Sequence, residues 1–177
     1  NLALGFAWLQ DKQPARARAA LERVRLDGAQ SSRALLGLGW ADVELEQYES
    51  ALTPWLELRD RNLLDAAVQE AYLAVPYAFA KLGANSQAAE YYEQALTSFD
   101  RETGRIDESI GRIREGRLMQ NLLGEPDGKA PQRGWFWQLQ DLPDAPESRY
   151  LYPIFAGNDF QEGLKNYRDL RLMQANL

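Results

Sequence analysis

The side chains available for chemistry in this chain are carboxylates, hydroxyls, lysines and arginines, because its 177 residues include neither histidine nor cysteine. Disulfides, thiol nucleophiles, zinc sites of the usual ligand types and serine–histidine catalysis are therefore excluded. The sequence also contains no glycine-rich phosphate loop, no nucleophile motif and no recognisable pair of catalytic carboxylates. These observations favour a protein that is not an enzyme and that holds no cofactor or metal ion.

Two clusters of charged residues come closest to a site. Asp141, Asp144 and Glu147 lie in a proline-bearing stretch, but their spacing is not that of an EF-hand, so a cation site is disfavoured. Five arginines interleaved with acidic residues lie at positions 101, 105, 112, 114 and 117. This alternation is typical of a solvated, ion-paired helix surface. The net charge of −6 also argues against a nucleic acid partner, which needs lysines and arginines to neutralise phosphates.

A repeat with a period of about 34 residues organises residues 1–100. An offset of 34 residues aligns Leu4-Gly5 with Leu38-Gly39, and a further offset of 37 residues aligns these with Val75-Pro76. The same two offsets align Leu21, Trp55 and Tyr92. The apolar spacing within each copy predicts two helices joined by a short turn. Such units stack on one another through their apolar faces.

These residues resemble the tetratricopeptide repeat family. The family pattern is a large residue, two spacers, Leu-Gly, two spacers and an aromatic, followed later by alanine, three spacers and an aromatic. The second copy matches it with Leu38-Gly39 and with Ala51 four residues before Trp55. Two departures are Asp42 in an aromatic position and Pro76 in the glycine position. The resemblance implies an all-α solenoid of helical hairpins whose function is to bind other proteins.

The resemblance also implies a concave groove lined by the first helix of each pair. The apolar residues that it places there are Leu2, Phe6, Leu9, Leu36, Trp40, Val43, Leu73 and Tyr77. Family members that grip a C-terminal carboxylate carry lysine and asparagine at such positions. Because the corresponding residues here are apolar, we do not expect a carboxylate clamp.

Two interpretations of this groove remain open. In the first, an external protein or peptide partner lays an apolar helical or extended segment in it, with Trp40 as the central anchor. In the second, the chain's own C-terminal part fills the groove, since large exposed apolar patches are rare in soluble monomers. The protein would then be a structural scaffold that spaces or holds other domains. The Trp40→Ala variant separates the two in part.

The repeat does not continue beyond residue 100, and we expect three segments in all. Residues 1–123 form the repeat array with a capping helix over 105–123, and residues 124–158 form an irregular segment rich in aromatics and proline. Trp135, Phe136 and Trp137 are its most apolar cluster. Residues 159–177 form an amphipathic helix, because apolar residues recur along it from Phe160 to Leu177 at helical spacing.

Several properties follow from composition and from the chain ends. No apolar run reaches the roughly 18–20 residues that cross a bilayer. The helical patterns at both ends lack caps, so we expect a segment of a longer protein, and exposed helix ends offer a route to a homo-oligomer. Sixteen arginines against four lysines are typical of a GC-rich bacterial genome. We therefore expect a soluble protein of the bacterial cytoplasm or cell envelope, with its compartment and partner unidentified.

Overall fold

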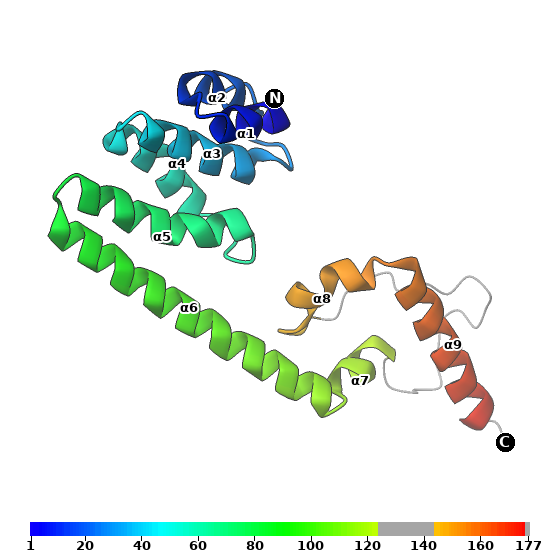
Figure 1. Ribbon diagram of the computed structural model, residues 1–177. Helices are drawn as coiled ribbons and strands as arrows, with labels where there is room; N and C mark the ends of the chain where they lie inside the picture. The colour runs from blue at the N-terminus through cyan, green and yellow to red at the C-terminus, as the bar shows by residue number, and fades with distance from the viewer. Residues whose placement is uncertain (124–143, 176–177) are drawn as a thin grey trace. The chain divides into compact units, whose positions relative to one another are not determined.

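The computed structural model describes residues 1–123 and 144–175, and within these ranges the chain is all-helical and has no strand. Successive helices pack as adjacent pairs (Figure 1). The all-α helical-hairpin architecture predicted from the sequence is therefore confirmed. The helices are α1 (Leu2–Gln10), α2 (Pro14–Leu21), α3 (Ser31–Glu44), α4 (Tyr48–Arg59), α5 (Ala66–Lys81), α6 (Asn85–Arg114), α7 (Arg117–Leu123), α8 (Ser148–Phe155) and α9 (Asn158–Ala175).

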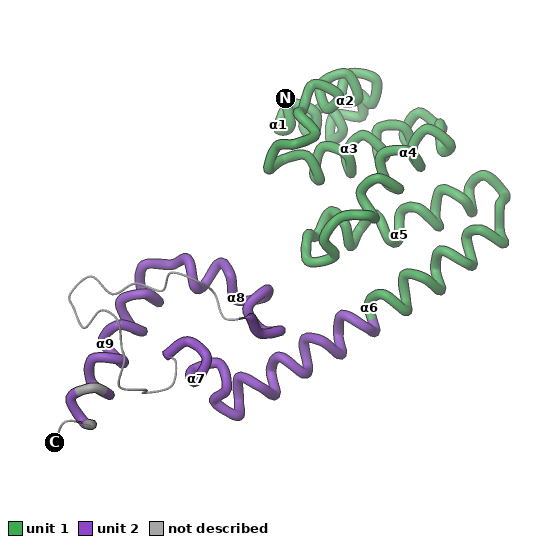
Figure 2. The backbone as a smooth tube through the Cα atoms, turned by 180° about the vertical axis from the view of Figure 1, so that it is seen from behind, with its two compact units in different colours: residues 1–99 green, residues 100–177 purple. Residues whose placement is uncertain are grey.

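The chain divides into two compact units, and the division falls inside α6 (Figure 2). Unit 1 comprises Asn1–Phe99 and unit 2 comprises Asp100–Leu177. Unit 1 covers the span of the sequence repeat, while the helix predicted over 105–123 belongs to unit 2.

The three helix pairs of unit 1 turn in the same way. Lys12, Glu46 and Gly83 have φ angles of 57°, 60° and 75°, so each turn passes through the left-handed region. The next residue in each turn donates its amide to the carbonyl five positions back, as in Ala84 to Phe79 at 2.9 Å. This pattern closes a helix C-terminus and satisfies carbonyls that would otherwise lack donors. The spacing found in the sequence is thus a repeat of backbone geometry.

Within the first two pairs, glycine on one helix admits a large side chain from the other. A Cβ atom on Gly5 would collide with the side chain of Leu21, and one on Gly39 would collide with the indole of Trp55. Both large residues are almost fully buried, at 1% and 0% exposure. Trp55 also donates its indole N–H to the carbonyl oxygen of Leu36 at 3.1 Å. The glycines therefore set how closely the paired helices approach.

The third pair packs differently, which the sequence alignment did not anticipate. Tyr92, aligned with Leu21 and Trp55, is 43% exposed, while its neighbour Tyr91 stacks on Phe79 with ring centroids 5.1 Å apart. Pro76 is buried at the position that glycine holds in the other pairs. A proline ring leaves no room for a large side chain there, so aromatic rings beside it hold α6 to α5.

The second helix of the third pair, α6, is much longer than expected. The sequence predicts one helix from about residue 86 and a separate one over 105–123, whereas α6 is continuous from Asn85 to Arg114. The break comes at Gly116, whose φ of 78° is left-handed and whose amide bonds to Ile113. Glycine tolerates that conformation without strain, so the helix ends there and α7 begins.

Unit 2 has a small apolar core formed by α7, α8 and α9. Leu122, Phe155 and Leu164 are buried in it, and the rings of Phe155 and Phe160 lie 5.1 Å apart. The helix α8 falls within the stretch for which the sequence predicted irregular structure. That expectation rested on its prolines, but burial of Phe155 stabilises a helix in spite of Pro153. Residues 124–143, including Trp135, Phe136 and Trp137, lie outside the described ranges.

Substitution of Gly39 by alanine tests the glycine contact. We expect Gly39→Ala to lower the free energy of unfolding by about 2 kcal/mol, because Trp55 is fully buried and its ring must shift. Gly163→Ala in α9 is the control, since a Cβ there meets nothing within 4 Å. It should raise stability by about 0.5–1 kcal/mol through helix propensity. Urea denaturation followed by circular dichroism measures both, and equal effects would contradict the packing argument.

Candidate functional site

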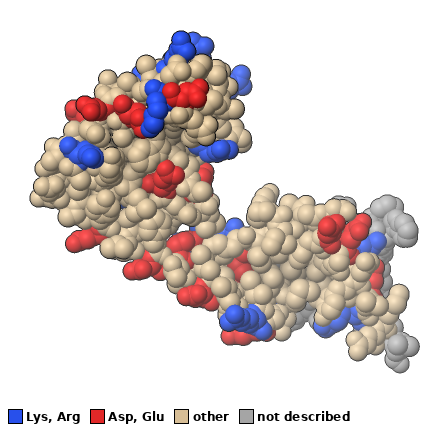
Figure 3. Space-filling model, in the orientation of Figure 1, with Lys and Arg blue, Asp and Glu red and all other residues tan. Residues whose placement is uncertain are grey.

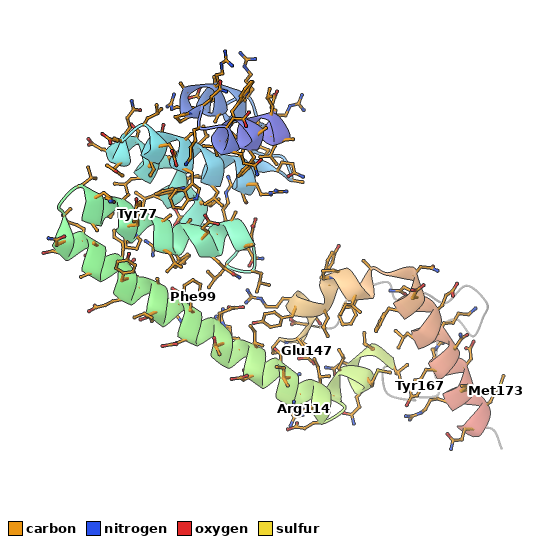
Figure 4. All side chains as sticks on the ribbon, viewed as in Figure 1. Tyr77, Phe99, Arg114, Glu147, Tyr167 and Met173 are labelled. Carbon is orange, nitrogen blue, oxygen red and sulfur yellow. The ribbon has the colours of Figure 1, made fainter. Side chains whose placement is uncertain are left out.

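The aromatic residues predicted to line the groove form a surface that we call the aromatic wall, defined by Phe6 of α1, Trp40 of α3 and Tyr77 of α5. Trp40 is its centre. Its ring lies 6.1 Å from that of Tyr77 and meets the buried Trp55 edge-on at 5.0 Å. Tyr77 extends from α5 on the side of α3 (Figure 4), in agreement with this contact. Two of the three aromatic residues, Trp40 and Tyr77, thus lie together, and Trp40 packs on the buried Trp55.

Phe6 approaches the same surface from α1. A Cβ atom on Gly37 would lie 3.2 Å from the Cζ atom of Phe6, so the ring rests against α3 where that helix lacks a side chain. The guanidinium of Arg33 lies 5.8 Å from the centre of the Phe6 ring. Phe6 therefore borders α3 one helical turn before Trp40.

The flanking apolar residues differ in their access to solvent. Leu36 is buried at 8% exposure and belongs to the core, whereas Leu73 is 52% exposed. Between these extremes lie the half-buried residues Leu2, Phe6, Leu9, Trp40, Val43 and Tyr77. Of the eight residues predicted from the sequence, seven thus keep apolar surface available, and Leu36 supports the wall from below.

Polar side chains hold the aromatic wall at its edges. Glu70 accepts a hydrogen bond from the indole N–H of Trp40 at 2.7 Å. The ammonium of Lys81 lies 5.5 Å from the centre of the Tyr77 ring. Lys12 bonds to Glu44 at 3.1 Å and so links the first turn to the end of α3. Because Trp40 is held by both Trp55 and Glu70, its ring is fixed in place without a partner.

A second feature of unit 1 was not predicted from the sequence. It is an open cavity of about 970 Å³, lined by residues from α2, α3, α4, α5 and α6 and by the adjoining turns. Leu38 and Leu56 contribute apolar surface, and Arg18, Asp42 and Arg59 contribute charge. The one sequence feature that pointed to it is Asp42, which is smaller than the aromatic residue expected at its position.

Asp42 is a buried carboxylate in this cavity. It is 2% exposed and accepts a hydrogen bond from Nε of Arg18 at 2.7 Å, while Nη1 of Arg18 lies 2.7 Å from Glu22. Burial raises the pKa of Asp42 above its usual value of 3.8, and the hydrogen bond and positive charge of Arg18 oppose that rise in part. The pair connects α2 to α3 and hence the first helix pair to the second.

Arg59 makes the corresponding connection between the second and third pairs. Its guanidinium lies 4.5 Å from the ring centre of Tyr72 and 4.6 Å from that of Tyr91, and it bonds to Gln94 at 3.0 Å. Phe99 extends this cluster from α6 and lies 5.8 Å from Tyr72 (Figure 4). Such contacts between one cation and two rings contribute roughly 0.5–1 kcal/mol each when half-exposed.

No family model, curated protein or solved structure matches this chain. The described helices include none long and apolar enough to cross a membrane. Nor do the described residues hold a group of three or more potential metal ligands.

The charged clusters noted in the sequence are dispersed. Asp144 is exposed, Glu147 is fully buried against Arg112 of α6 at 2.8 Å, and Asp141 lies outside the described ranges. Arg105 and Arg117 pair with acidic neighbours at 3.5 and 2.7 Å. Figure 3 shows acidic and basic side chains scattered over the face in view, with wide neutral areas between them.

The buried Asp42 predicts a specific dependence of stability on pH. Its folded pKa lies above the unfolded value of 3.8, so the folded protein binds the proton more tightly than the unfolded chain. The contribution of Asp42 to the free energy of unfolding should therefore fall as the pH rises from below 3.8 through the raised folded pKa. Asp42→Asn should remove this decline, and Asp60→Asn, at an exposed residue of the same cavity, should retain it. Urea denaturation from pH 3 upward measures the difference, which would have the opposite sign if Arg18 outweighed burial.

Proposed function

We propose that unit 1 is a tetratricopeptide-like, non-catalytic interaction module that binds an apolar helical or extended protein segment along the aromatic wall. The observation that carries the proposal is the pairing of Trp40 and Tyr77 beside Leu73, which is 52% exposed although apolar. The recurring turn at Lys12, Glu46 and Gly83 supports the family resemblance. On the arginine-rich composition, we extend the proposal to a bacterial protein of the cytoplasm or cell envelope.

Preorganisation makes this surface suited to binding. A binding site gains affinity when its side chains are already ordered, since ordering a flexible side chain costs about 0.5–1.5 kcal/mol. Trp40 is held by Trp55 on one side and by Glu70 at its indole nitrogen. The ring therefore offers apolar area at small entropic cost, which is characteristic of interface hot spots.

The chemistry of the partner follows from the residues of the wall. The first helix of each of the three pairs contributes apolar side chains to the wall. The bound segment should therefore carry apolar residues at helical or alternating spacing. The edges carry charges of both signs, with Arg33 and Lys81 opposite in sign to Glu70. A segment with mixed polar flanks fits them better than one of a single charge.

A structural scaffold is the alternative function. The observation that favours it is the exposed apolar surface of α9, where Leu170 and Met173 are 65% and 66% exposed and Tyr167 is 42% exposed. An amphipathic helix with such a face needs an apolar partner. In this alternative a C-terminal segment of the chain fills the groove, and the module spaces other domains of a larger protein.

Selection of peptides tests the binding function. Phage-displayed peptides selected on the full chain should carry apolar residues at helical or alternating spacing. Leu73→Glu should weaken their binding by about tenfold or more, because it places a carboxylate on the wall. Fluorescence anisotropy with labelled peptides measures this affinity.

Leu96→Glu supplies a matched control for that experiment. Leu96 is 64% exposed on α6, so the same change there adds the same charge without touching the wall. Peptide affinity should remain that of the unsubstituted chain. Failure to enrich any peptide, or equal weakening by both variants, would contradict the proposal and favour the scaffold.

A further inference from the structure

The part of α6 in unit 2 presents two different faces. One carries Glu102 and Ser109, which are 8% and 3% exposed. Glu102 accepts a hydrogen bond from the hydroxyl of Tyr150 in α8 at 2.8 Å, and Arg112 bonds to Glu147 at the start of α8. This polar face is therefore the one that α8 covers.

The adjacent face of the same helix is apolar and uncovered. Ile106, Ile110 and Ile113 are 38%, 39% and 37% exposed, and Thr103, one turn earlier, is also exposed. Their spacings of three, four and three residues are those of a coiled-coil seam. Isoleucines placed on such a seam, each more than a third exposed, indicate a helix that packs against another helix.

Charges along the seam identify the second helix. Asp100 and Arg114 lie on one flank at the two ends, and neither has an ion-pair partner among the residues that the structure describes. In an antiparallel pair of identical helices, each Asp100 comes near Arg114 of the second copy, giving two attractive pairs. Asp107, midway along this flank, meets its own counterpart and gives one repulsive pair. In a parallel pair this flank would face the opposite flank of the second copy, so that Asp107 would come near Glu102 of the second copy and give two repulsive pairs.

We infer that this seam, running from Asp100 to Gly116, is the interface of an antiparallel homodimer. In this arrangement Ile106 lies opposite Ile110 of the second copy, and Thr103 lies opposite Ile113 of the second copy. The pairing ends at Gly116, where α6 itself is interrupted. Four such layers form a short interface, so the dimer should dissociate on dilution.

Engineered cysteines test the pairing directly, because the chain has no cysteine of its own. Ile106→Cys and Ile110→Cys proteins, one of them tagged, should form a mixed disulfide when combined under mild oxidation. Each alone should crosslink several times more slowly, and Leu96→Cys should crosslink no faster than by random collision. Preferential crosslinking of Ile106→Cys to itself would indicate a parallel pair, and rates equal to the Leu96→Cys control would overturn the interface.

Charge reversal supplies an independent test on the same chain. Asp100→Arg or Arg114→Asp should weaken dimerisation by about fivefold, since each replaces two attractions by two repulsions. The double variant should restore it, because the attractive pairs return with their signs exchanged. Sedimentation velocity over a wide range of protein concentration measures all four proteins. A chain that stays monomeric throughout, or a double variant weaker than both single ones, would overturn the proposal.

Discussion

Close approach of paired helices, permitted by glycine, is the constraint on which the first two helix pairs of unit 1 depend. Where Gly5 and Gly39 lack a Cβ atom, Leu21 and Trp55 enter the space and become almost fully buried. Each glycine costs helix propensity, and the burial of a large side chain offsets that cost. From this position Trp55 also donates a hydrogen bond to the carbonyl oxygen of Leu36, so one residue contributes both apolar burial and a buried hydrogen bond.

The aromatic wall depends on this packing. Trp40 lies next to Gly39 in the chain and rests edge-on against Trp55, so the contact that closes the second helix pair also fixes the ring that faces outward. On the other side of the unit, neighbouring pairs are joined by polar contacts, with Arg18 holding Asp42 and Arg59 held between two tyrosines. Apolar packing thus acts within pairs and also between them, since α3, α4 and α5 share one buried core, and charged side chains add contacts between pairs.

Much of unit 1 was predictable because its geometry recurs locally. The same turn and the same glycine contact repeat, so the helices from α1 to α5 follow from apolar spacing. The sequence did not predict that Tyr91, and not the aligned Tyr92, packs against α5, because this packing depends on the space that Pro76 occupies in the folded protein. The uninterrupted α6 was not predicted because the 34-residue period ends near residue 100, and α8 was not predicted because distant packing of Phe155 outweighs the effect of proline. Contacts such as those of Arg59 with Tyr72 and Tyr91 join residues that are distant in the sequence, and the spacing of apolar residues does not predict them.

The left-handed turn residues carry a consequence for the origin of the array. They lie at positions 12, 46 and 83, and the aligned second-helix residues at 21, 55 and 92 follow nine positions later in every case. The three additional residues of the last copy therefore lie in the link near residues 60–65, between hairpins, and the interior of each hairpin has the same length. A whole hairpin is thus the repeating structural unit of the array. Duplication or loss at such links lets evolution alter the length of the array without redesigning its internal contacts.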